Sequence, residues 1–491
     1  MDEGTLDTWC ATSADSMRQS FGAAISVRGG SFAQREVDAL ALANELVRGW
    51  LEGELVRMAT SYGRELRVDG QLYREHAAGT RRYHTLCGAV EVHRSTYRRA
   101  GVHNGPTVVP LELEAGIVEN ATPALALSAA QAFATMPLRL YEDEMRAAHR
   151  VLPSRSTVER IAKRLGDGIH EQLHAIEPVV RASETVPAEA ASISVGVDRT
   201  TIPMAEQLPA LPDYWHRDRA RRPPPPVVMA YRMAYVATVA IVDVDGEELV
   251  TKRLAATAEE GPIEMMERLG AELDHILRER PRLPVVVVQD GAPELWNLVE
   301  EWFGNFGIPI EMKLLDRFHL DERLAQVAEM IERDEQLRRR LLTSWRESLD
   351  RSDRAIRGIC KQIEDRIYEP LDAPAERAAF RTFYQAFGWE PERTLRIGRH
   401  SGRLLEGHVA YCRNNAMKMR YATAKKRGFP IGSGVTEGAC KSVIASRLKR
   451  SGQRWFERGA STCLQMRTLH LNDRLQSSLD LYIEHRRARL E

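Results

Sequence analysis

The sequence predicts an α/β protein whose central part is a mixed β-sheet with helices packed on it. Three strand-like segments rich in apolar and β-branched residues come first, at 192–198, 229–244 and 248–257. Helix-like and strand-like segments then alternate, at 259–280, 284–290, 294–303, 309–316 and 319–334. The helix-rich residues 334–430 follow, a stretch too long for a loop inside a compact domain. These observations predict a hairpin joined to a parallel sheet, and then an inserted subdomain that is all helical.

The composition is that of a folded globular protein. A chain of 491 residues is long enough for about two to four domains. A hydrophobic content of 43% and a charged content of 28% exclude a disordered chain. The 69 basic and 69 acidic residues cancel, so any binding of nucleic acid has to depend on local charge.

The cysteines and the lengths of the apolar runs predict the cellular compartment of the protein. The six cysteines include no CxxC pair, which argues against a zinc knuckle or a disulfide framework and is typical of a reducing cytoplasm. No apolar run approaches the roughly 20 residues of a membrane span. The acidic N-terminal residues lack a signal-peptide pattern. We therefore expect a cytoplasmic protein with no membrane contact.

The N-terminal region, residues 35–180, is predicted to be mainly helical. Polar residues 1–34 precede it, and we expect them to be disordered. Apolar residues at helical spacing predict a helix from Glu36 to about Tyr62. Alternating residues in 85–101 predict a hairpin or strand pair.

Three short helical segments follow in this region, at 121–136, 137–152 and 154–167. Ser154 or Ser156 can cap the last one, and Glu159 lies at capping-box spacing from Ser156. Helices joined by tight turns are typical of a helix-turn-helix, but equally of a bundle with a solvated basic face. On the first interpretation the last helix contacts DNA through its basic side chains, which are Arg155, Arg160, Lys163 and Arg164.

Residues 178–192 are predicted to be a linker, after which the central domain begins. We place its first part at 190–333, the helical insertion at 334–430 and its last part, with a basic C-terminal helix, at 431–491. A loop containing RARRPPPP, residues 219–226, interrupts the first strands, and Asp245-Gly246 is a hairpin turn. Three strands followed by alternating helices and strands are the order of an RNase H-like domain.

Two aspartates end strands of this predicted sheet. Asp198 ends the first strand and Asp290 ends the fourth, and these strands are neighbours in an RNase H-like sheet. Sites in open α/β sheets lie at the carboxyl ends of strands, so we expect the two carboxylates to converge. Such hard oxygen ligands suit a pair of Mg²⁺ ions. The alternative is a turn role, since Asp198 can cap a turn and Asp290-Gly291 is a turn dipeptide.

A single acid in a basic segment is the third candidate ligand. Glu437 is the only acidic residue between Lys418 and Arg454, a stretch with ten Lys or Arg residues. A basic run attracts phosphates, and a carboxylate inside it can hold a divalent cation against a phosphodiester. The alternative is a surface ion pair with Lys441 at i,i+4 spacing.

The residues after Glu437 are candidates for contact with DNA. The basic ones are Lys441, Arg447, Lys449, Arg450 and Arg454. Trp455 beside them could stack on an extruded base, although an aromatic residue at this spacing is more often part of a core.

Three motifs resemble those of a known family. They are VVVVQDGAPELWNLVEEWF, LLDRFHLDERL and GFPIGSGVTEGACKSVIASRLKRSGQRW, and the likeness covers roughly residues 80–475. The chain resembles bacterial insertion-sequence DDE transposases of the ISKra type, which are related to Mutator-like transposases. The resemblance implies that Asp198, Asp290 and Glu437 are the three catalytic acids, with a helical insertion before the glutamate. In the family the first aspartate is usually followed by glycine, whereas Arg199 follows it here.

A fourth candidate comes from the second motif. Asp316 and His319 match a D-x-x-H signature of Mutator-like relatives, at the end of the fifth strand and close to Asp290. The resemblance implies that His319 touches the scissile phosphate or a flanking base. The alternative is helix capping by Asp316 beside a half-buried histidine.

The expected function is therefore DNA transposition, a form of DNA recombination. Two Mg²⁺ ions, with Mn²⁺ as a substitute, are expected to support strand cleavage at the ends of an insertion sequence and strand transfer into target DNA. We expect double-stranded DNA as the partner, a homodimer or higher oligomer on it, and a nucleoid location. Two alternatives stay open: a domesticated DNA-binding protein without activity, and a stand-alone RNase H-superfamily nuclease.

Overall fold

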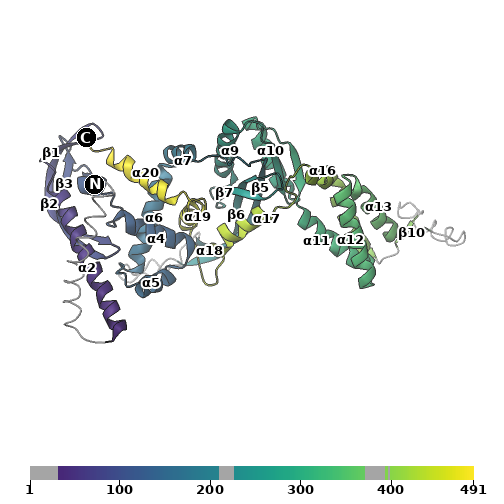
Figure 1. Ribbon diagram of the computed structural model, residues 1–491, viewed down its shortest axis with the longest axis horizontal. Helices are drawn as coiled ribbons and strands as arrows, with labels where there is room; N and C mark the ends of the chain where they lie inside the picture. Colours follow the sequence, from purple (N-terminus) through teal and green to yellow (C-terminus); the bar gives the residue numbers. More distant parts are fainter. Residues whose placement is uncertain (1–30, 209–225, 371–392, 396–398) are drawn as a thin grey trace. The chain divides into compact units, whose positions relative to one another are not determined.

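The computed structural model describes residues 31–208, 226–370, 393–395 and 399–491 (Figure 1). The predicted RARRPPPP loop and almost all of the N-terminal segment 1–34 lie outside the described residues, although Phe32 already belongs to a helix. In the described part of the chain no helix is long and apolar enough to cross a membrane.

The chain divides into two compact units. The first contains Met1–Val180 together with Arg458–Glu491, and the second is Arg181–Glu457. The boundary at 180 agrees with the predicted one. The C-terminal boundary differs, because we assigned residues 431–491 to the central domain and the last two helices pack in the first unit instead.

The first unit begins with a long helix on an antiparallel sheet. Helix α2 (Phe32–Ala59) starts at Ser31, whose side chain accepts a hydrogen bond from the Gln34 backbone NH. The sheet has the order β1-β2-β3-β4. Its strands are β1 (Glu65–Val68), β2 (Gln71–Thr85), β3 (Gly88–Arg99) and β4 (Thr107–Val108). We predicted that residues 85–101 form a hairpin or strand pair by themselves. Most of this segment is instead the single strand β3, which pairs with β2.

Helices form the rest of the first unit. They are α3 (Pro110–Glu114), α4 (Pro123–Thr135), α5 (Leu138–Ala147), α6 (Arg155–Glu171), α19 (Glu457–Leu471) and α20 (Leu475–Arg487). Helix α7 (Leu173–Ala182) spans the boundary to the second unit. The three predicted helices are thus confirmed as α4, α5 and α6. Ser154 is the N-cap of α6, and Glu159 pairs with Lys163 instead of closing a capping box.

Glycines of α6 let the C-terminal helices approach closely. A Cβ atom on Gly166 would lie 2.3 Å from the Thr462 side chain of α19. A Cβ atom on Gly168 would lie 2.5 Å from the hydroxyl of Tyr482 in α20. The C-terminal helices therefore pack on α6 through contacts that only glycine permits.

The second unit is built on a five-stranded mixed sheet of order β7-β6-β5-β8-β9. Its strands are β5 (Ser192–Gln207), β6 (Val227–Val242), β7 (Glu248–Ala256), β8 (Val285–Gln289) and β9 (Met312–Leu315). β5, β6 and β7 pair antiparallel, while β8 and β9 extend the sheet in parallel from β5. Helices α9 (Pro262–Glu279) and α10 (Pro293–Phe306) cover one face over a core that includes Val195, Val287 and Leu269.

The helical insertion follows β9. Its helices are α11 (Arg317–Ile331), α12 (Glu335–Arg351), α13 (Ala355–Ile367), α15 (Arg399–Asn414), η1 (Ala416–Lys418) and α16 (Tyr421–Lys426). Figure 1 labels α11, α12, α13 and α16. They enclose a core of their own around Trp345 and Leu349. The insertion is not all helical, because β10 (Tyr368–Pro370) and β11 (Arg393–Leu395) form a small antiparallel pair.

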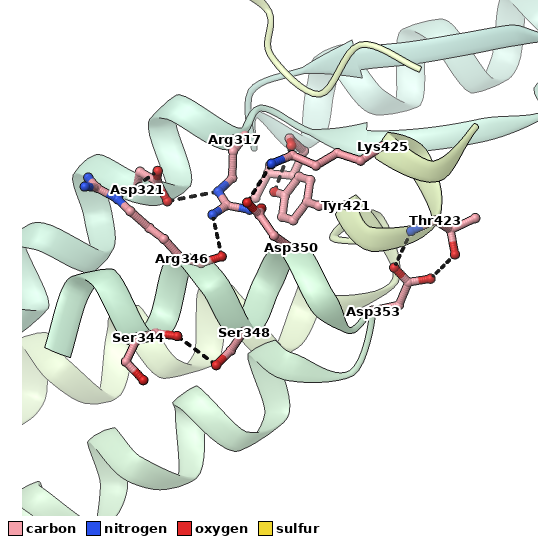
Figure 2. A network of polar contacts seen from close by, with 11 residues as sticks. Arg317, Asp321, Ser344, Arg346, Ser348, Asp350, Asp353, Tyr421, Thr423 and Lys425 are labelled. Atoms are coloured by element: carbon pink, nitrogen blue, oxygen red, sulfur yellow. Dashed lines mark hydrogen bonds and ion pairs between the residues drawn. The ribbon is translucent and has the colours of Figure 1, made fainter. Parts of the chain in front are cut away.

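A polar network fixes this insertion to the end of β9 (Figure 2). The Arg317 guanidinium pairs with Asp321 and Asp350, each at 3.0 Å, and lies 5.0 Å from the ring centre of Tyr421. The Tyr421 hydroxyl donates to the backbone oxygen of Leu315, the last residue of β9, at 2.9 Å. One buried arginine thus joins α11, α12 and α16, which are far apart in the sequence.

We expect Gly166→Ala to lower the free energy of unfolding by about 1–3 kcal/mol, the usual cost of overpacking. The reason is the clash with Thr462, which requires α6 and α19 to separate. Denaturant unfolding followed by circular dichroism measures it. Gly53→Ala in α2 is the matched control, because nothing lies within 4 Å of a Cβ atom there. Equal effects of the two changes would contradict the packing assigned to the C-terminal helices.

Candidate active site

Asp198 and Asp290 follow the paired part of two neighbouring parallel strands. Val195 of β5 and Val287 of β8 form the last pair between these strands, and each aspartate comes three residues after its strand's member of that pair. Adjacent strands are about 4.8 Å apart. Asp290 is the residue after β8, as predicted. The prediction that Asp198 ends its strand was wrong, since β5 continues to Gln207 as a two-stranded ribbon with β6.

Helix α17 (Gly434–Ala439) lies on the face of the sheet to which these aspartates belong. Gly196 is two residues before Asp198, so both residues lie on one face of β5. A Cβ atom on Gly196 would be 2.1 Å from the Thr436 hydroxyl of α17. That hydroxyl also hydrogen-bonds to Thr238 of β6 at 2.7 Å. The next residue of α17 is Glu437, so all three predicted acids are on the same side of one sheet.

Glu437 is paired with a lysine in this conformation. Its carboxylate accepts a hydrogen bond from Lys441 at 2.6 Å, and the two side chains are 45% and 72% exposed. This is the i,i+4 pair that the alternative interpretation predicts. A pair between exposed side chains contributes at most about 1 kcal/mol, so a divalent cation can compete with Lys441 for this carboxylate.

A thiol that the sequence analysis did not single out lies between two of the acids. Burial and the hydrogen-bonded carboxylate of Asp198 raise the pKa of Cys440, and Glu437 adds to this effect while Lys449 opposes it. The raised pKa favours the protonated thiol. It lies at the start of a π-helical segment, Cys440–Ala445, which follows α17 directly. Single π-helical turns inside helices are frequent at functional sites.

Asp316 connects the site to the insertion. Its side chain is 1% exposed and accepts hydrogen bonds from the backbone NH groups of His319, at 3.0 Å, and Ser433, at 2.8 Å. The first bond caps α11, as the alternative interpretation predicts. The second holds the glycine-flanked turn from which α17 starts.

His319 lies between Asp316 and Asp290. Its ring nitrogen Nδ1 is 2.5 Å from the Asp316 carboxylate, and the side chain is 47% exposed. Burial alone lowers the pKa of His319. The hydrogen bond and charge of Asp316, with the charges of Asp290 and Glu322, outweigh burial and raise this pKa. The raised pKa favours the charged form of the ring, in which both ring nitrogens are hydrogen-bond donors.

A cavity of about 320 Å³ opens beside Asp290. Its other lining residues are Gly291, Ala292, His319, Glu322, Arg323, Gln326 and Tyr411. The Arg323 guanidinium lies 3.8 Å from the ring centre of Tyr411, a residue of the insertion. The sequence analysis missed both residues, because their proximity to Asp290 depends on how α15 folds back over α11.

The basic residues after Glu437 divide into buried and exposed ones. Arg447 and Trp455 are buried, with the guanidinium 4.7 Å from the ring centre of the indole. This conformation therefore presents neither side chain to DNA, and Trp455 is part of a core, as the alternative for it predicts. Lys449, Arg450 and Arg454 are exposed, and Lys449 donates to the Thr200 hydroxyl of the β5–β6 ribbon at 2.5 Å.

The basic residues of α6 stay on the surface of the first unit. Arg155, Arg160 and Arg164 are exposed. Arg160 pairs with Glu119 at 2.7 Å, and Lys163 pairs with Glu159 at 2.5 Å. Exposed pairs of this kind are weak and leave the side chains available to a phosphate.

The donor chemistry of the three acids suits Mg²⁺, but the described conformation does not gather them around one point. Asp198 and Asp290 each use one carboxylate oxygen to accept a nearby backbone NH, and Glu437 uses one for Lys441. Hard carboxylate oxygens are the ligands that Mg²⁺ prefers. No three His, Cys, Asp or Glu side chains of the described residues lie close enough together to hold a metal ion. An ion bound by all three would require Glu437 to leave Lys441.

Comparisons with known proteins identify neither a family nor a function for this site. The chain matches no protein-family profile, and none of the curated proteins matches it significantly.

We expect Asp316→Asn to lower the pKa of His319, because it removes the charge and weakens the strongest hydrogen bond that raises it. NMR titration of the histidine ring measures the value. A pKa of His319 that is higher in the folded state also stabilises the fold. This contribution to the free energy of unfolding is complete below pH 6.5, about the pKa of the unfolded state, and is lost as the pH rises through the pKa of the folded state. His319→Gln is the control and should remove this loss above pH 6.5. A His319 pKa that is unchanged in Asp316→Asn would contradict the contact.

Proposed function

We propose that the second unit is a metal-dependent phosphodiester transferase acting on DNA, a DDE-type transposase with an RNase H-like catalytic sheet. The observation that carries this proposal is that Asp198 and Asp290 follow paired segments of neighbouring parallel strands, with Glu437 on the helix that covers the same face. The strand order, three antiparallel strands extended by two parallel ones, is what an RNase H-like sheet requires. The helical insertion before Glu437 also supports the transposase over a stand-alone nuclease.

The three carboxylates would hold the divalent cations. When bound, such ions lower the pKa of a water molecule and stabilise the charge that develops on the phosphate. The residues of the chain position this chemistry. Asp198 and Asp290 are positioned by the sheet, whereas Glu437 is on a short helix and would hold a cation in place of Lys441. Water then attacks a phosphodiester at the end of the element, and the released 3′-hydroxyl attacks target DNA without a covalent protein intermediate.

Basic side chains around the acids would hold the DNA backbone. Lys449 and Arg450 are exposed in the segment that follows Glu437 and can neutralise phosphates. His319, a donor beside Asp290, can hydrogen-bond a non-bridging oxygen of the scissile phosphate. The second candidate function is a DNA-binding protein without activity on this scaffold. The pairing of Glu437 with Lys441 favours it, because that pairing uses the third acid for an ion pair.

We expect Asp290→Asn to slow Mg²⁺-dependent cleavage of an element end by about a thousandfold or more, since the amide keeps the shape of the side chain and removes a charged ligand. End binding should be nearly unchanged. Gel-based cleavage and anisotropy assays on the same DNA separate the two readouts. The matched control is Asp245→Asn, an exposed aspartate of the β6–β7 turn. Cleavage by Asp290→Asn at the wild-type rate would exclude the proposed metal site.

We expect replacement of Lys449 and Arg450 with alanine to weaken DNA binding for all sequences. The log–log salt dependence should flatten by up to about two units, one for each lost phosphate contact. Fluorescence anisotropy at several salt concentrations measures this slope. Arg447→Ala is the control: because Arg447 is buried against Trp455, it should lower thermal stability instead. An unchanged slope in the double variant would assign these residues to folding.

A further inference from the structure

The first unit contains a larger cavity that the proposed catalysis does not use. Its volume is about 640 Å³. The lining comes from β2, β3, α6 and α20 and from the segment between β4 and α4. Five arginines contribute to it, namely Arg81, Arg94, Arg164, Arg486 and Arg489. Arginines from four separate elements meet at one cavity, so the concentration of charge is a product of the fold.

Three of these arginines have guanidinium nitrogens available to a ligand. Arg81 uses Nε for the Asn120 side chain at 2.9 Å, and Arg94 uses Nε for the Tyr83 hydroxyl at 3.4 Å. Their terminal nitrogens make no hydrogen bond within the described residues. Arg164 is exposed and makes no hydrogen bond or ion pair with any residue that the structure describes. The terminal nitrogens of a guanidinium form the fork that binds phosphate with two parallel hydrogen bonds.

The other two arginines are fixed charges in the wall. Arg486 donates to the backbone oxygen atoms of Ile117, at 2.7 Å, and Glu112, at 3.2 Å. Burial lowers the pKa of Arg486; Tyr482 and Glu112 oppose this effect, whereas the charges of Arg164 and Arg489 add to it. The guanidinium groups therefore repel one another across the cavity, and a bound anion would relieve that repulsion.

The acids of the lining do not cancel this charge. They are Glu112, Glu119 and Glu171. Glu112 accepts the Tyr83 hydroxyl at 2.8 Å, and Glu119 pairs with Arg160, which does not line the cavity. Arg489 is balanced in turn by Asp69 at 3.0 Å. Arg81, Arg94 and Arg164 thus have no carboxylate partner among the described residues, and the cavity has a positive excess.

The accessible wall of the cavity is mainly polar. Its apolar residues Leu113, Ile117 and Val118 are almost fully buried, so they offer little surface to a ligand. A phosphate group, which binds through charge and hydrogen bonds, matches such a wall. The volume is also sufficient for a ligand of nucleotide size, since small-molecule sites occupy roughly 300–1,000 Å³.

We propose that this cavity binds the phosphate of a nucleotide through Arg81, Arg94 and Arg164. The nucleotide is either free or the terminal one of a DNA strand, since both present the same chemistry. The inference does not depend on the metal site of the second unit. It also assigns Arg164 to a pocket, whereas the sequence analysis assigned it to a helix face that reads DNA.

The test uses the full chain without divalent cations, in the Asp290→Asn background, so that failure of the proposed catalysis does not affect it. The probes are a fluorescent ATP analogue and a short single-stranded oligodeoxynucleotide with or without a 5′-phosphate, both followed by anisotropy. Arg164→Gln and Arg94→Gln remove two of the proposed donors. Arg139→Gln is the matched control, because it changes an exposed arginine of α5, in the same unit, that does not line the cavity. Arg164 has no partner within the described residues, so its variant should fold normally.

We expect Arg164→Gln to weaken binding of a phosphate-bearing probe by about tenfold or more, the loss of one charge-assisted contact, and Arg139→Gln to leave it unchanged. Tight binding of the 5′-phosphorylated strand alone would identify a DNA end as the source of the phosphate. Binding of the ATP analogue that the strand cannot displace would identify a free nucleotide. Two results would overturn the proposal: no binding of either probe by the parent protein, or equal losses in Arg164→Gln and Arg139→Gln.

Discussion

The candidate site depends on the buried carboxylate of Asp316. It holds the backbone NH groups of His319 and Ser433, and it is 1% exposed. Removing a partner from a buried charge costs about 3–5 kcal/mol, so these contacts hold the start of α11 against the turn before α17. The whole helical insertion lies between the two bonded segments. Asp316 therefore closes the insertion onto the sheet, and the place of Glu437 follows from that closure. Arg317, the next residue, ties α12 and α16 to the same junction.

The five-stranded sheet of the second unit could be predicted from the sequence because its strands carry their own apolar pattern. Val285 to Val288 are buried on both faces, so the run of valines is unambiguous. Strand β2 could not be predicted in the same way. Most of its side chains are exposed, and it forms because β3 and β1 pair with it on both sides. The local sequence also does not predict that Arg458–Glu491 belongs to the first unit. This packing depends on close contacts at Gly166 and Gly168 with residues far away in the sequence.

In the candidate site, too, contacts between residues close in the sequence could be predicted, whereas long-range contacts could not. The strand order alone predicts that Asp198 and Asp290 are neighbours, and the register bears this out. The i,i+4 pair of Glu437 with Lys441 is equally local, and it was the alternative to a metal ligand. The contact of Cys440 with Asp198 and the burial of Arg447 against Trp455 depend on how the π-helical segment meets β5, which no spacing in the sequence predicts.

The central claim is that Asp198, Asp290 and Glu437 hold divalent cations together, although Glu437 pairs with Lys441 in this conformation. Anomalous diffraction from crystals of the protein soaked in Mn²⁺ tests it most directly. The account predicts an anomalous peak between Asp198 and Asp290, with Glu437 turned from Lys441 to coordinate the ion. Crystals that diffract well at high Mn²⁺ concentration, with no peak at these aspartates and the Glu437–Lys441 pair intact, would contradict it.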